Sequence, residues 1–160
     1  MRKILFRGKR VNNGEWVYGF YAFFASNKGL KHGIYTGTEN GCVIPFEVIP
    51  ETVGQYTGLT DKNGKMIFEG DIVKDNNLEK VLLSDDRIKG RSGIAIVKFG
   101  LHDIPSEDPF CWGSAYGFYF DGDTLFPTPA QYSPFDKYSE SEFEVIGNIH
   151  DNSELLEVEE

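Results

Sequence analysis

The chain has 160 residues, of which 40% are hydrophobic and 14% aromatic, so it can bury a core, and global disorder is excluded. Its formal net charge of −9 argues against generic coating of DNA, which requires many Lys and Arg contacts to phosphate. No apolar run reaches the roughly 18 residues of a membrane span, and the N-terminus lacks the apolar stretch of a secretory signal, so we expect a cytoplasmic protein with no membrane contact.

The chain opens with a predicted β-hairpin whose strands cover residues 4–11 and 15–21. Asn13-Gly14 lies between them and is typical of a type I′ turn, which needs positive φ angles. Residues 25–31 are polar and contain a glycine, so we expect a loop there. Two weaker strand candidates follow at residues 32–36 and 42–49. The aromatic residues and glycines together favour an all-β fold with little helix.

The centre and the C-terminal half contain further strand signals. The run Asp61-Lys62-Asn63-Gly64 predicts a turn between two strands. Further strands are predicted at residues 70–74, 93–100, 115–120 and 142–150. Leu78, Val81 and Leu82 have helical spacing, which predicts a short helix over residues 77–85. Asp151-Asn152-Ser153-Glu154 resembles a helix cap and predicts one helical turn near the C-terminus.

Three blocks of sequence carry a resemblance to a known family. They are Phe6–Lys9 with Gly14–Gly19, Val53–Lys74, and Phe143–His150 followed by Glu154-Leu155-Leu156. In this order they resemble the YopX family of phage and prophage proteins and span nearly the whole chain. The resemblance implies a small protein of a bacterial host, with an all-β structure whose C-terminal half is an SH3-like barrel. It implies no established activity, so no functional residue is carried over.

The predicted elements and the resemblance together give an expected organisation of the chain. Residues 1–52 would form an N-terminal β-hairpin region, and residues 53–150 the SH3-like β-barrel. Residues 151–160 would add a short helical turn and an acidic tail. Two stretches exceed the shorter family pattern and are expected to be extended loops, at 75–92 and 121–141. Such loops are where the specificity of one family member most easily resides.

The residues that could perform chemistry form no convincing catalytic or metal-binding set. His32, His102 and His150 lack the close spacing of zinc ligands, and His102 falls in a predicted loop. Cys42 and Cys111 lack the CxxC spacing, so we interpret them as reduced, partly buried thiols, with a disulfide between them as the alternative.

Two acidic segments contain carboxylates of the kind that bind metal ions. The run that begins at Asp61 resembles a calcium loop, but Met66 and Ile72 stand where Gly and Glu are needed. Asp121-Gly122-Asp123 is interpreted as a turn. We therefore expect no metal, no cofactor and no enzymatic activity.

The remaining function class is surface recognition. The candidate partner-binding residues are basic ones in the first strand and aromatic ones in the Pro-rich stretch: Arg7, Lys9, Arg10, Phe126, Tyr132, Phe135 and Tyr138. The aromatic residues of the predicted strand 115–120 are interpreted as core. The leading hypothesis is a protein-binding or regulatory accessory protein that also self-associates, because its basic start and acidic end are complementary. The alternative is nucleic-acid binding by the barrel, aided by the basic hairpin.

Overall fold

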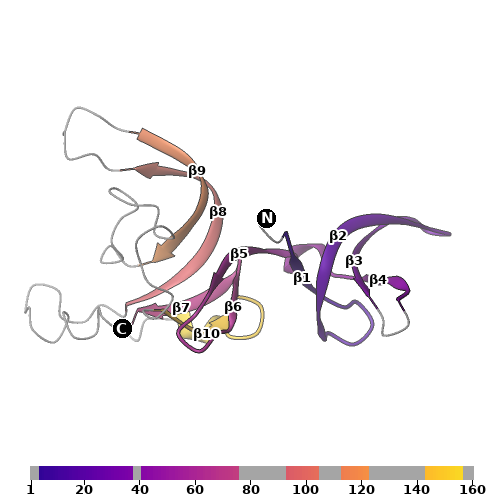
Figure 1. Ribbon diagram of the computed structural model, residues 1–160, viewed down its shortest axis with the longest axis horizontal. Helices are drawn as coiled ribbons and strands as arrows, with labels where there is room; N and C mark the ends of the chain where they lie inside the picture. The colour runs from indigo at the N-terminus through magenta and orange to yellow at the C-terminus, as the bar shows by residue number, and fades with distance from the viewer. Residues whose placement is uncertain (1–3, 38–40, 76–92, 105–112, 123–142, 157–160) are drawn as a thin grey trace, which may run out of the picture. The chain divides into compact units, whose positions relative to one another are not determined.

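The computed structural model describes residues 4–37, 41–75, 93–104, 113–122 and 143–156 (Figure 1). The chain divides into two compact units, Met1–Gly58 and Leu59–Glu160. The regular elements of the described residues are strands and two short 3-10 turns, which confirms the all-β class. No helix among these residues has the length and hydropathy required to cross a bilayer. The residues predicted to form a helix at 77–85 lie outside the described part of the chain.

The first sheet has the strand order β4-β3-β2-β1-β5-β6. Its elements are β1 (Phe6–Lys9), β2 (Trp16–Ser26), β3 (Gly29–Gly37), β4 (Val43–Glu47), the 3-10 turn η1 (Pro50–Thr52), β5 (Gly54–Thr60) and β6 (Met66–Phe68). The pairings from β4 through to β5 that have a resolved register are all antiparallel. β1 therefore pairs with β2 on one side and with β5 on the other.

The β1–β2 and β2–β3 turns of the first unit differ from the sequence prediction. Only Gly14, with φ of 72°, has a positive φ in the β1–β2 turn, so the type I′ prediction is wrong. Instead the side-chain oxygen of Asn13 accepts a hydrogen bond from the Glu15 amide. The loop predicted at 25–31 is also wrong, because β2 and β3 continue until Ser26 pairs with Gly29.

The core of the first unit is small and depends on close backbone approach. Ile34 and Val48 are its fully buried apolar side chains among the described residues. A Cβ atom on Gly19 would lie 2.0 Å from the carbonyl oxygen of Tyr35. Only a glycine therefore permits β2 to approach β3 at this point.

The second sheet has the strand order β10-β7-β8-β9. Its strands are β7 (Asp71–Asp75), β8 (Ile94–Ile104), β9 (Gly113–Gly122) and β10 (Phe143–Asn148), followed by the 3-10 turn η2 (Ser153–Leu156). Within the described residues this sheet is open, with β10 and β9 as its two ends, so the SH3-like barrel is not confirmed. His102 lies in β8 and not in a loop, because this strand continues four residues past the predicted end at Gly100.

The core of the second unit lies on one face of this sheet. It consists of Ile67, Val73, Ala95, Val97, Phe118, Phe143 and Val145, with Leu59 and Phe120 packed against it. The interpretation of the β9 aromatics as core is therefore correct for Phe118 and Phe120. It is wrong for Tyr116, which is 72% exposed.

Candidate interaction surface

The longest projecting element of the first unit is a hairpin, here called the β2–β3 arm and defined as residues 20–26 paired with 29–35. β1 pairs with β2 only as far as Gly19. β4 pairs with β3 only as far as Gly33. Toward its tip the arm is therefore a two-stranded ribbon within the described part of the chain (Figure 1). Because alternate residues face opposite sides of a strand, each side of this ribbon presents a distinct set of side chains.

One side of the arm carries an ordered aromatic cluster. The Tyr21 hydroxyl lies 2.5 Å from Nδ1 of His32. The Phe23 ring meets the His32 ring edge-on, with 4.8 Å between centroids, and Phe6 contacts Tyr21 at 5.7 Å. These contacts hold the Phe23 ring in place while 56% of the residue remains exposed.

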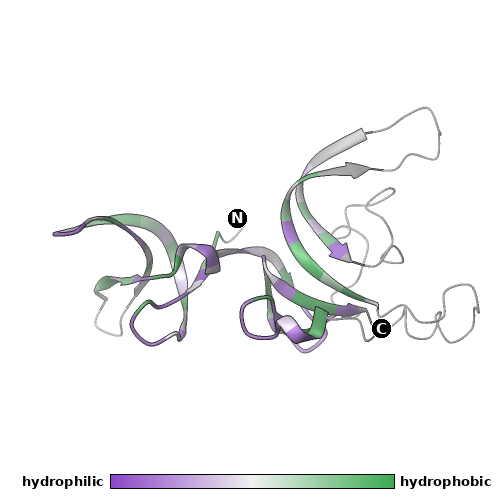
Figure 2. Ribbon diagram, turned by 180° about the vertical axis from the view of Figure 1, so that it is seen from behind, coloured by the Kyte–Doolittle hydropathy of each residue, from purple (hydrophilic) through white to green (hydrophobic). Residues whose placement is uncertain are grey.

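Leu30 continues the same side of the arm towards its tip. It pairs with Ala25, two residues beyond Phe23 on β2, and is 74% exposed. The apolar character of β2 is visible along this hairpin (Figure 2). An exposed Phe that neighbouring rings fix in one orientation, with an exposed Leu nearby, has the properties of an anchor for a partner protein.

The basic residues of β1 are engaged within the protein. The Arg7 guanidinium lies 4.7 Å from the centre of the Trp16 ring, and Arg7 is only 5% exposed. The Lys9 ammonium lies 5.6 Å from the same ring. Arg7 and Lys9 thus form cation–π contacts with one tryptophan, and the burial of Arg7 keeps its charge away from an external phosphate.

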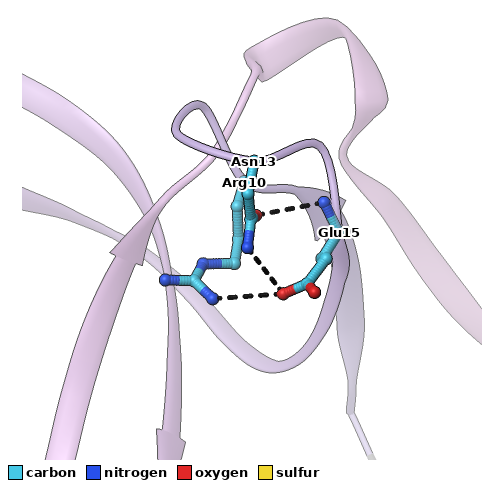
Figure 3. Close-up of polar contacts among 3 residues, drawn as sticks. All are labelled: Arg10, Asn13 and Glu15. Carbon is cyan, nitrogen blue, oxygen red and sulfur yellow. Dashed lines mark hydrogen bonds and ion pairs between the residues drawn. The ribbon is translucent and has the colours of Figure 1, made fainter.

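Arg10 directly follows β1 and has two side-chain partners. Its guanidinium lies 4.3 Å from the Phe46 ring centre, and Nη1 lies 3.4 Å from Oε2 of Glu15. Figure 3 shows that Asn13 completes this arrangement by donating from Nδ2 to the same Glu15 oxygen at 2.6 Å. The charge of Arg10 is therefore offset by an acid of the same turn.

The structure separates the predicted binding residues into two groups. Arg7, Lys9 and Arg10 lie on β1 and its following turn, and their role in binding stays a prediction. The four predicted aromatic residues, Phe126, Tyr132, Phe135 and Tyr138, lie outside the described residues. Sequence reasoning missed Phe23 and Leu30 because the polar segment from Ser26 to Lys28 resembles a long loop.

The acidic turn at residues 61–64 has a structural function. Asp61 is 3% exposed. Its Oδ1 accepts hydrogen bonds from the Asn63 and Lys65 backbone amides at 2.8 and 2.9 Å. Its Oδ2 accepts a hydrogen bond from the Val145 backbone amide at 3.0 Å. Desolvation by burial raises the pKa of Asp61, but these amide hydrogen bonds lower it, and the net pKa is below the ordinary value.

Other chemistry-bearing groups are dispersed. Among the residues that the structure describes, no three His, Cys, Asp or Glu side chains converge as metal ligands. Cys42 is exposed, so the prediction of a partly buried thiol is wrong for it, and Cys111 lies outside the described residues. Asp121 of the predicted acidic turn is the penultimate residue of β9 and pairs with Lys98.

These features define an all-β protein of two open antiparallel sheets that exposes apolar side chains on its strands. The chain belongs to the YopX protein family, whose model matches residues 5–157. A search of curated proteins gives no significant match. Among solved structures, the crystal structure of protein EF1440 from Enterococcus faecalis aligns with 98% of this chain and 100% of its own, at 23% identity and a TM-score of 0.47.

Proposed function

We propose that this YopX-family protein is a non-enzymatic accessory protein of a prophage, which binds other proteins in the cytoplasm of the bacterial host. Its proposed binding element is the β2–β3 arm, and the observation that carries the proposal is the exposure of Phe23 and Leu30 on one side of it. The proposal includes self-association, for which the basic start and acidic end of the chain supply charge complementarity.

The arm has the energetic properties of a binding element. Full burial of a Phe or Leu side chain is worth about 1.5–3 kcal/mol relative to full exposure. Because Phe23 is 56% exposed and Leu30 is 74% exposed, more than half of this burial free energy remains available to a bound partner. Contacts with Tyr21 and His32 already order the Phe23 ring, so binding costs less side-chain entropy there. A two-stranded ribbon is only marginally stable in water, and a partner on the arm would stabilise it.

The test is a tagged pull-down from cells that carry the induced prophage, with and without nuclease. The doubly substituted Phe23→Ser/Leu30→Ser protein should recover at least tenfold less of a nuclease-resistant protein partner than the unsubstituted chain. Val43→Ser is the matched control, because Val43 is also an exposed strand residue (62%) but pairs with Gly37 on the other side of the sheet. Equal recovery by the double variant would refute the arm as the binding element.

Nucleic-acid binding is the second candidate, and one observation favours it. Lys9, Tyr18 and Phe20 share a face by the β1–β2 register, and Phe20 is 67% exposed. Exposed aromatic rings on a face that also carries a cation can stack on unpaired bases. If this candidate holds, Phe20→Ser and Lys9→Glu each weaken binding to single-stranded nucleic acid, and recovery in the pull-down disappears with nuclease.

A further inference from the structure

The distal half of the β8–β9 hairpin extends beyond the rest of its sheet. β7 pairs with β8 only at residues 94–96, whereas the β8–β9 pairing continues from Ala95–Gly122 to Ile104–Gly113. Beyond Val97 the described part of this sheet is therefore a two-stranded ribbon. Such a ribbon needs a third strand or a covered face for stability.

An apolar strip runs along this ribbon from the core outwards. Phe118 is buried in the core, and its ring lies 4.8 Å from Phe99. Phe99 in turn meets Tyr116 edge-on at 5.1 Å, and Leu101 pairs with Tyr116 across the ribbon. Leu101 and Tyr116 are 68% and 72% exposed, so the strip is buried at one end and open at the other.

The sequence of β9 lacks the Pro and Lys residues that commonly prevent strand pairing at the edge of a sheet. β9 is ten residues long and is the last strand of its sheet within the described residues. It contains no Pro and no Lys, and Asp121 is its one charged residue. Long, weakly charged edge strands of this kind readily pair with another strand.

We propose that β9 pairs antiparallel with β9 of a second copy, with the two-fold axis at Gly117. This register places Tyr116 opposite Phe118 of the other copy, so the two apolar strips join on one face. The two Asp121 residues then lie at opposite ends of the interface, about 27 Å apart at the rise of a strand, where their repulsion is screened. The product is a closed, self-complementary dimer with a continuous sheet through both copies.

In this register β9 is a better partner for β9 of a second copy than for the outer edge of β8 of a second copy. On each side of the axis Tyr116 faces Phe118, Tyr119 and Phe120 face the small residues Ala115 and Ser114, and Asp121 faces Gly113 and not another acid. The distal part of β8 instead carries the charged residues Lys98 and Asp103. This inference specifies the self-association within the proposed function, but it involves β9 and not the β2–β3 arm.

The test is disulfide cross-linking at the axis, with Cys42 and Cys111 replaced by serine. In an antiparallel pair, directly opposite Cα atoms lie about 4.5–5.5 Å apart, within the range that a disulfide spans. A Cβ at Gly117 has no atom within 4 Å, so Gly117→Cys fits and should cross-link to a dimer of twice 18.1 kDa. Gly37→Cys is the matched control, because Gly37 is equally open but lies in β3, and it should stay monomeric.

A charge at position 116 tests the same interface without a disulfide. Tyr116→Lys places two like charges at diagonal positions across the axis, whose backbones lie about 7–8 Å apart, and should reduce cross-linking at least tenfold. Absence of the Gly117→Cys cross-link, or cross-linking unaffected by Tyr116→Lys, would overturn the proposal. The Phe23→Ser/Leu30→Ser protein should still form the dimer, so loss of partner binding and loss of self-association are separately measurable.

Discussion

Replacement of Asp61 by alanine should destabilise the second unit strongly, because this carboxylate joins the turn after β5 to β10. The Val145 amide that it accepts from is buried, and a buried amide left without an acceptor costs about 1–3 kcal/mol. The Asn63 and Lys65 amides are half-buried and can bind water, so each adds about 0.5–1 kcal/mol. The sum, about 2–5 kcal/mol, is a large part of the stability of a small domain.

The asparagine variant tests the direction of these hydrogen bonds. Its single carbonyl oxygen can replace Oδ1 at the Asn63 and Lys65 amides, but its NH2 group would then face the Val145 N–H, donor against donor. Asp61→Asn should therefore lose the β10 bond and cost about 1–3 kcal/mol. Urea unfolding of the full chain measures both variants. A loss below about 0.5 kcal/mol for Asp61→Ala would refute the role assigned to this carboxylate.

Three further predictions concern pH, backbone approach and surface charge. The folded pKa of Asp61 lies below its ordinary value of 3.8. The contribution of this carboxylate to folding stability is therefore present above pH 3.8 and is lost as the pH falls through the folded pKa. In acid titrations, the difference in stability between the unsubstituted chain and Asp61→Asn should narrow below pH 3.8. Gly19→Ala places a Cβ 2.0 Å from the Tyr35 carbonyl oxygen and should lower the free energy of unfolding by more than about 2 kcal/mol. Gly37→Ala should lower it by under about 0.5 kcal/mol. Equal melting temperatures for the two variants would contradict the close approach of β2 and β3. Lys98→Ala breaks an ion pair with Asp121 whose side chains are both about half exposed, so stability should change by less than about 1 kcal/mol and the change should vanish in high salt.

The sequence predicts features that depend on neighbouring residues better than those that depend on distant ones. The Asp61–Gly64 turn is correctly predicted because Gly64 supplies a positive φ locally, at 79°. The hydrogen bond from Val145 to Asp61 joins residues 84 positions apart, so no local pattern indicates it. The expectation of a barrel rests on the family resemblance. Strand order decides whether a sheet closes, and the sequence of a single strand does not encode it.

The candidate surfaces likewise depend on contacts between distant residues, which the local sequence does not indicate. The alternation of side chains along a strand places Tyr116 and Phe118 on one face of β9, but it does not show that the core ends between them. That boundary depends on how far β7 extends along β8, which is a property of the tertiary structure. The β2–β3 arm was missed because a tight turn at Ser26–Gly29 and a polar loop have the same composition.

The central claim is that the β2–β3 arm binds a protein, and site-specific photo-cross-linking in the induced host tests it most directly. A photoreactive phenylalanine would replace Phe23 in one protein and Val43, on the other side of the sheet, in another. We expect a discrete, nuclease-resistant protein adduct from position 23 and none from position 43. The same adducts from both positions, adducts that nuclease removes, or none from position 23 would contradict the account.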